Sequence, residues 1–120
     1  MSRQYLGPYI NFGGRAREAM EFYHKVLGGS LDVKALRLET DGGRILGTDG
    51  HPNYPAKVGE NMAIALGGTD RDRMTKMFHG LAEGGKIKGA LGPQAGGGEV
   101  GYLMDKFGIN WVVSIDQAER

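Results

Sequence analysis

The sequence predicts an α+β fold in which two similar modules, each built around one helix, form one curved mixed sheet. Phe22 is followed six residues later by the pair Gly28-Gly29, and Phe78 is followed at the same distance by Gly84-Gly85. Ahead of each Phe lie a short apolar run, a further glycine pair and a charged amphipathic segment. A sequence pattern that recurs once, 56 positions later, indicates one supersecondary unit used twice. The 120 residues are enough for one domain with its own core.

The first module begins with a strand over residues 8–12, which contains the apolar run Pro8-Tyr9-Ile10-Asn11-Phe12. A helix is predicted from Ala16 to Leu27. Its apolar residues recur at spacings of three and four, as on one face of a helix, and are Ala16, Ala19, Met20, Tyr23 and Val26 with Leu27. Gly28-Gly29 should end this helix, because glycine adopts the left-handed C-terminal conformation at little cost.

The second module repeats this order. Residues 62–66 predict a strand, and Thr69 or Asp70 should cap the next helix. The apolar stripe of that helix comprises Met74, Met77, Phe78, Leu81 and Ala82. Three strands should follow, over residues 86–91, 100–104 and 109–115, with a hairpin turn at residues 105–108 joining the last two.

The first module has less room after its helix. The turn at Asp41-Gly42-Gly43 begins only twelve positions after Gly29, which predicts one strand from Leu31 to Leu38 before its partner from Arg44 to Thr48. We therefore expect βαββ in the first module (residues 5–49) and βαβββ in the second (residues 61–116). Residues 50–60 are rich in turn formers and should link the two within a single domain.

Composition excludes several classes of function. The net charge is +1, so no basic surface for nucleic acid or an anionic membrane is expected. The absence of cysteine rules out disulfides, thiolate metal sites and a cysteine nucleophile. The first residues lack a signal-peptide pattern, and no apolar run approaches the ~20 residues of a membrane span. A cytoplasmic location is expected.

Several segments together resemble the glyoxalase/bleomycin-resistance (vicinal oxygen chelate) superfamily, and within it the subgroup described as similar to demethylubiquinone methyltransferase. The segments are 8–12 with 18–23, then 81–86, then 105–111. The resemblance implies a cup-shaped sheet. In metal-dependent members, His and Glu side chains inside the cup hold a divalent ion that activates two neighbouring oxygens of the substrate. It does not imply methyl transfer, because no methyl-donor site is recognisable.

The metal ligands that the resemblance implies are missing from their expected positions. Those positions hold Pro8, Ile64 and Val112, with the fourth near Ala35. Proline and aliphatic side chains cannot bind a hard or borderline cation. We therefore expect no metal and no cofactor.

Period-two alternation suggests which residues line the cup in place of metal ligands. Pro8, Ile10 and Phe12 should share one face, and Ile64 and Leu66 should share the equivalent face with Val112. These side chains could equally fill a core. The polar and aromatic candidates at the rim are Arg37, Glu39, Glu99 and Tyr102. Arg37 and Glu39 would bind an anionic group if they face the cup, and would be an ordinary solvated edge otherwise.

Three functions remain open from the sequence. The first is a metal-free homodimeric protein that binds a small apolar or aromatic compound in the cup. The second is a glyoxalase-type lyase, isomerase or dioxygenase whose metal is held by unusual ligands such as His51, Glu39 or Glu99. The third is a shortened family member with a structural or lost role.

Overall fold

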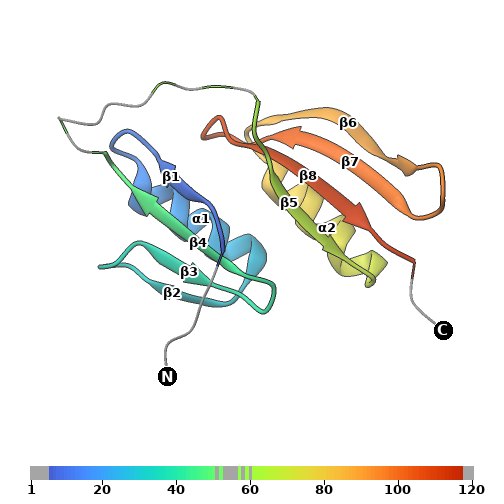
Figure 1. The fold of residues 1–120 in the computed structure, drawn as a ribbon, viewed down its shortest axis with the longest axis horizontal. Helices are drawn as coiled ribbons and strands as arrows, with labels where there is room; N and C mark the ends of the chain where they lie inside the picture. Colours follow the sequence, from blue (N-terminus) through green and yellow to red (C-terminus); the bar gives the residue numbers. More distant parts are fainter. Residues whose placement is uncertain (1–5, 51, 53–56, 58, 60, 118–120) are drawn as a thin grey trace. The chain divides into compact units, whose positions relative to one another are not determined.

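Each half of the chain folds into a four-stranded sheet with one helix packed on one face (Figure 1). The computed structural model describes residues 6–50, 52, 57, 59 and 61–117. It contains two compact units, Met1–Lys57 and Val58–Arg120, and each is described here by itself.

The first unit contains β1 (Tyr9–Asn11), α1 (Ala16–Leu27), β2 (Ser30–Asp32), β3 (Arg37–Glu39) and β4 (Arg44–Thr48). The second contains β5 (Ile64–Gly68), α2 (Arg71–Ala82), β6 (Lys86–Pro93), β7 (Glu99–Met104) and β8 (Asn110–Ile115). The strand orders are β1-β4-β3-β2 and β5-β8-β7-β6. In both sheets the first strand pairs in parallel with the last, and the other pairs are antiparallel. The predicted α+β fold is confirmed, and both units have the same topology.

The first module is complete, and the expectation of βαββ was wrong. Two short strands, β2 and β3, replace the single strand expected from Leu31 to Leu38. The chain reverses between them because Leu36 adopts a left-handed conformation (φ 52°) and the Asp32 carboxylate accepts a hydrogen bond from the Ala35 amide at 3.1 Å. No glycine or proline marks this turn, and its one turn former, Asp32, was placed inside the expected strand. The third function loses its premise, because the module is not shortened.

The strands form two four-stranded sheets, whereas one continuous sheet was expected. Each of these sheets is built from the strands of one unit. In each unit the first strand joins the sheet by parallel pairing with the last strand, β1 with β4 and β5 with β8.

The two helices supply the cores. All but one member of each predicted stripe is buried: Val26 in α1 and Ala82 in α2 are half-buried. Against these stripes pack Leu38 of β3, and Leu103, Trp111 and Val113 of β7 and β8, none more than 1% exposed. Neither of these twelve-residue helices, the two that the structure describes, is long enough to cross a membrane.

The glycine pair after each helix meets the same two backbone requirements in both units. The first glycine of each pair turns the chain with a positive φ, 77° at Gly28 and 76° at Gly84. The second lets two backbone segments approach closely. A Cβ atom at Gly29 would collide with the carbonyl oxygen of Glu39, and one at Gly85 with that of Met104. The repeat in the sequence therefore reflects a repeated backbone requirement.

The helix N-termini are capped differently in the two units. Asp49, the residue after β4, accepts hydrogen bonds from the amides of Gly14 (2.9 Å) and Ala16 (2.8 Å) at the start of α1. Asp70 caps α2 locally and accepts from the Arg73 amide at 3.1 Å. The first helix thus depends on a residue 33 positions away, and the second on its own flank.

Candidate functional site

Strand register divides the predicted site residues of the first unit between the two faces of its sheet. Ile10 is paired with Gly47, where an added Cβ would lie 3.1 Å from Met20 of α1 and 3.2 Å from Phe12. Ile10 and Phe12 therefore lie on the helix-covered face. The ring of Phe12 packs on that of Tyr23, with 5.9 Å between the ring centroids. Pro8 precedes β1, and its carbonyl oxygen accepts a hydrogen bond from the Leu46 amide at 2.9 Å.

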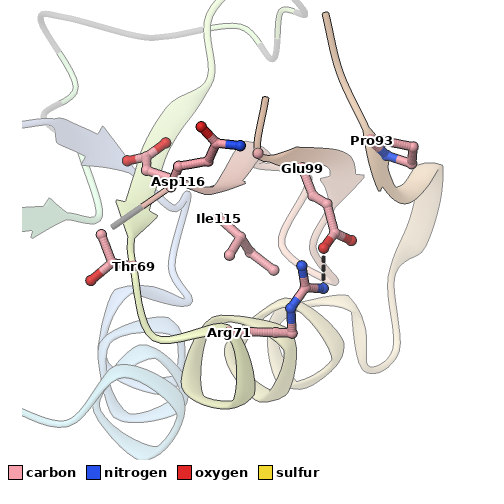
Figure 2. A pocket seen from close by; sticks show the side chains of 8 residues that line it. Thr69, Arg71, Pro93, Glu99, Ile115 and Asp116 are labelled. Carbon is pink, nitrogen blue, oxygen red and sulfur yellow. Dashed lines mark ion pairs between the residues drawn. The ribbon is translucent and has the colours of Figure 1, made fainter. Parts of the chain in front are cut away.

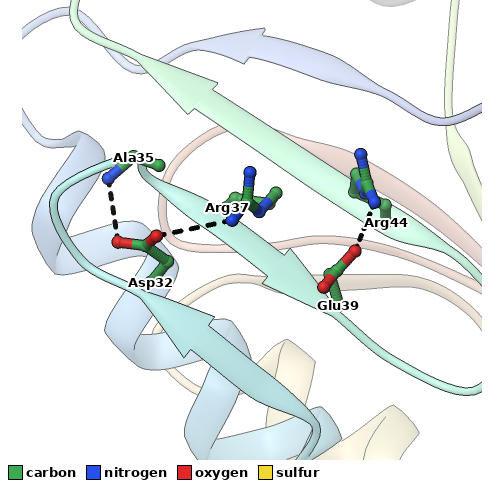
Figure 3. Close-up of polar contacts among 5 residues, drawn as sticks. All are labelled: Asp32, Ala35, Arg37, Glu39 and Arg44. Atoms are coloured by element: carbon green, nitrogen blue, oxygen red, sulfur yellow. Dashed lines mark hydrogen bonds and ion pairs between the residues drawn. The ribbon is translucent and has the colours of Figure 1, made fainter.

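The other face of each sheet, turned away from the helix of its own unit, is called the helix-free face below. In the first unit it carries Arg37 and Glu39, since the residue between them, Leu38, is buried against the helix side beside Ile45. Figure 3 shows both in ion pairs: Arg37 with Asp32 at 3.4 Å, and Glu39 with Arg44. These ion pairs are partly exposed, with 26–48% of each side chain accessible. The anion-binding role predicted for Arg37 stays a prediction.

In the second unit, the expectation that Val112 shares a face with Ile64 and Leu66 was wrong. The register pairs Ile64 with Trp111 and Leu66 with Val113, both buried. Val112 is paired with Ala65 and with Tyr102, on the helix-free face. The sequence positions were matched one residue out of phase, and a shift of one residue moves a side chain to the opposite face of a sheet.

The helix-free face of the second sheet is apolar at its centre and polar at one end. Val100, Tyr102 and Val112 lie there, and Tyr102 is 47% exposed. The Tyr102 ring lies over Gly89 of β6, where an added Cβ would lie 3.1 Å from its Cδ2 atom. At the polar end, the Lys88 ammonium donates a hydrogen bond to Oδ1 of Asn110 at 3.3 Å. This surface offers an aromatic ring beside aliphatic side chains.

Glu99 lies elsewhere, in a pocket of about 440 Å³ inside the second unit (Figure 2). Its neighbours on β7 at alternate positions, Gly101 and Leu103, face α2, so Glu99 is on the opposite face from Tyr102. Glu99 is 18% exposed and forms an ion pair with Arg71, the first residue of α2. The residues that line the pocket are Thr69, Arg71, Pro93, Gly98, Glu99, Ile115, Asp116 and Gln117.

Sequence reasoning found only Glu99 among these pocket residues. The others come from the start of α2, the turn between β6 and β7, and the end of β8, and only the sheet brings them together. One signal was present: Asp49 and Asp116 both follow the last strand of their module, at matching places in the repeat.

The donor set does not fit the divalent metal of the superfamily. The helix-free positions of β1, β4, β5 and β8 hold no His, Asp or Glu; they are Tyr9, Asn11, Arg44, Leu46, Thr48, Ala65, Gly67, Asn110, Val112 and Ser114. Over the described ranges, no three His, Asp or Glu side chains gather as metal ligands would. Of the unusual ligands considered, Glu39 and Glu99 each pair with an arginine, and His51 lies outside the described residues.

Comparison with solved structures identifies the fold. Protein PA1353 from Pseudomonas aeruginosa is 28% identical, with a TM-score of 0.87 over 97% of this chain and 100% of that one. A glyoxalase/bleomycin resistance protein from Albidiferax ferrireducens is 17% identical, with a TM-score of 0.69 over 91% of this chain and 95% of its own. The chain has the glyoxalase/bleomycin-resistance fold.

The subgroup resemblance has a counterpart among structures with this fold. A PhnB protein from Bacillus cereus, described as a 3-demethylubiquinone-9 3-methyltransferase, is 22% identical, with a TM-score of 0.71 over 93% of this chain and 99% of that one. No protein-family model and no curated protein sequence matches the chain. The glyoxalase/bleomycin-resistance resemblance read from segments 8–12, 18–23, 81–86 and 105–111 is therefore confirmed at the level of the fold.

Proposed function

We propose that this protein binds a small apolar or aromatic compound, without a metal, on the helix-free face of its second sheet. The observation that carries the proposal is Tyr102, which is 47% exposed on that face beside Val100 and Val112. Ligand sites are mostly apolar with few polar groups, and an aromatic ring can stack on a flat ligand. Lys88 and Asn110 at the edge of the same face supply the polar contacts.

A binding role is supported over metal catalysis by the chemistry of the side chains present. The acidic candidates, Glu39 and Glu99, are each ion-paired with an arginine, Arg44 and Arg71. Among solved structures of this fold are proteins described as glyoxalase/bleomycin resistance proteins.

The test is titration with N-phenyl-1-naphthylamine, an apolar aromatic compound whose fluorescence rises in apolar surroundings. We expect saturable binding at one molecule per chain, weakened about fivefold or more in Tyr102→Ala because a stacked ring contributes roughly 1 kcal/mol beyond its buried area. Ile87→Ala is the matched control, since Ile87 is 43% exposed but pairs with Leu103 on the helix side. Binding that does not saturate, or that both variants weaken equally, would refute the proposal.

The protein is further proposed to be a cytoplasmic homodimer. Within its own sheet, each edge strand, such as β6, pairs with a neighbour on one side only, and a second subunit could cover the other side. Light scattering after size-exclusion chromatography measures the mass directly, and a mass of 12.9 kDa would show a monomer instead.

A further inference from the structure

The helix-free face of the second sheet carries two oxygen-bearing side chains at the end of β8, Ser114 and Asp116. Ser114 pairs with Gly67 of β5 and lies on the same face as Tyr102. A Cβ atom added at Gly67 would lie 2.7 Å from the Ser114 hydroxyl oxygen and 3.4 Å from Oδ2 of Asp116. Both side chains therefore lie over Gly67, and Figure 2 shows the Asp116 carboxylate directed away from Glu99 on the other face.

Comparison with the first unit shows that the Asp116 carboxylate is not needed to cap a helix. Asp49 and Asp116 each follow the last strand of their sheet, and Asp49 uses its carboxylate to cap α1. In the second unit Asp70 caps α2 instead. The Asp116 backbone amide donates to the Gly68 carbonyl at 2.8 Å, but its exposed carboxylate has no partner among the described residues. This carboxylate is therefore available to a ligand on the helix-free face.

The two ends of this face carry opposite charges. Lys86 pairs with Met104 at the start of β6, and the Lys88 ammonium reaches Asn110 at the start of β8. Asp116 lies beyond the other end of β8. The face is thus positive where β6 and β8 begin and negative where β8 ends. A cationic group is attracted to the Asp116 end and repelled from the lysine end.

We propose that the compound bound on this face is an arylalkylammonium compound, an inference that rests on the function proposed above. Its aromatic ring stacks on Tyr102, and its ammonium group donates hydrogen bonds to the Asp116 carboxylate and the Ser114 hydroxyl oxygen. The strand register sets the spacing between these two contacts. Tyr102 pairs with Val112, and Ser114 lies two positions further along β8, which is roughly 7 Å at the usual rise of a strand. A butyl chain between the ring and the nitrogen covers this distance.

The experiment is a titration of the isotope-labelled full chain with 4-phenylbutylammonium at neutral pH, followed by the backbone amide signals of Gly67, Tyr102 and Ser114. The comparison ligands, 4-phenylbutan-1-ol and 4-phenylbutyrate, have the same ring and chain but a neutral and an anionic end. We expect saturable shifts, with the ammonium compound bound about fivefold more tightly than the alcohol, as an ion pair with an exposed carboxylate allows. The anionic compound should bind more weakly than the alcohol.

Replacement of Asp116 by Asn should lower the affinity for the ammonium compound about fivefold, to that for the alcohol. The same variant should bind the alcohol and the uncharged N-phenyl-1-naphthylamine as the wild type does. Asp72→Asn is the matched control, because it removes the same charge from an exposed position in the first turn of α2, on the opposite side of the sheet. It should leave the affinity for every one of these compounds unchanged.

The outcomes separate this inference from the proposed function. If naphthylamine binds but the ammonium compound and the alcohol bind equally, the inference is refuted and the proposed function stands. An equal loss in Asp116→Asn and Asp72→Asn would show general electrostatic attraction and also refute it, as would ammonium binding that Tyr102→Ala does not weaken. If neither naphthylamine nor any of the phenylbutyl compounds binds, the proposed function fails, and this inference fails with it.

Discussion

The indole nitrogen of Trp111 donates a hydrogen bond to Oδ2 of Asp105 at 2.9 Å, and both residues are buried (1% and 2% exposed). The other oxygen, Oδ1, accepts from the backbone amides of Phe107 (2.9 Å) and Ile109 (3.1 Å). One carboxylate thus closes the β7–β8 turn and holds the largest side chain of the second core.

Replacement of Asp105 by Asn should destabilise the protein. An amide group presents one NH₂ where the carboxylate presents an oxygen, so a buried donor loses its acceptor. The expected loss is about 2–3 kcal/mol of unfolding free energy. Urea unfolding followed by fluorescence of Trp111, the sole tryptophan, measures it. Asp72→Asn serves as the exposed control, and a loss in Asp105→Asn no larger than in that control would contradict the assignment.

The second glycine of each pair should not tolerate a side chain. Gly29→Ala and Gly85→Ala each place a methyl group against a strand carbonyl oxygen, so a loss of roughly 2 kcal/mol or more is expected in each, typical of severe overpacking. Gly42→Ala is the control, because nothing lies within 4 Å of an added Cβ there. Thermal unfolding of the three variants compares them. Equal midpoints would show that the close approach is not required.

The different capping of the two helices predicts unequal effects of two equivalent aspartates. Asp49→Ala removes an acceptor from two amides and should cost about 1–2 kcal/mol. Asp116→Ala should cost less than about 0.5 kcal/mol, as surface substitutions usually do. Denaturant unfolding of both variants decides the matter, and similar losses would mean that Asp116 also supports its unit.

The left-handed residue between β2 and β3 predicts an order of stability among substitutions. At φ 52°, Leu36→Asn should be more stable than Leu36→Val by about 1 kcal/mol or more, since asparagine tolerates this conformation and β-branched residues do not. Leu36 is half-buried, and asparagine removes more apolar surface there than valine does, so a more stable asparagine variant would reflect the backbone conformation. Thermal unfolding gives that difference, and a more stable valine variant would rule out this conformation of the turn.

The parts of the fold that the sequence predicted are those with a local signal. The bounds of α1 and the strand Arg44–Thr48 follow from spacing and glycine boundaries, and Asp70 is one of the two caps expected. The β2–β3 turn was missed because residues 33–36 contain no usual turn former. The prediction that Ile64 and Val112 share a face was wrong, because alternation shows that successive side chains change faces but not which face each one takes. That is set by the pairing of β5 with β8.

The candidate site was harder to predict for a related reason. Tyr102 and Glu99 were both expected near a ligand, yet they lie three positions apart on β7 and therefore on opposite faces of the sheet. The other residues that line the pocket around Glu99 come from separate elements, which only the folded sheet brings together.

The glycine pairs have a consequence for the way substitutions are tolerated along the chain. Because an added Cβ at Gly29 or Gly85 would collide with a strand carbonyl oxygen, a saturation mutagenesis screen should record two matching intolerant positions, each just after a helix whose buried positions accept many apolar exchanges. Two such matching positions would reveal the repeated unit from fitness data alone, even where the two halves differ in their side chains.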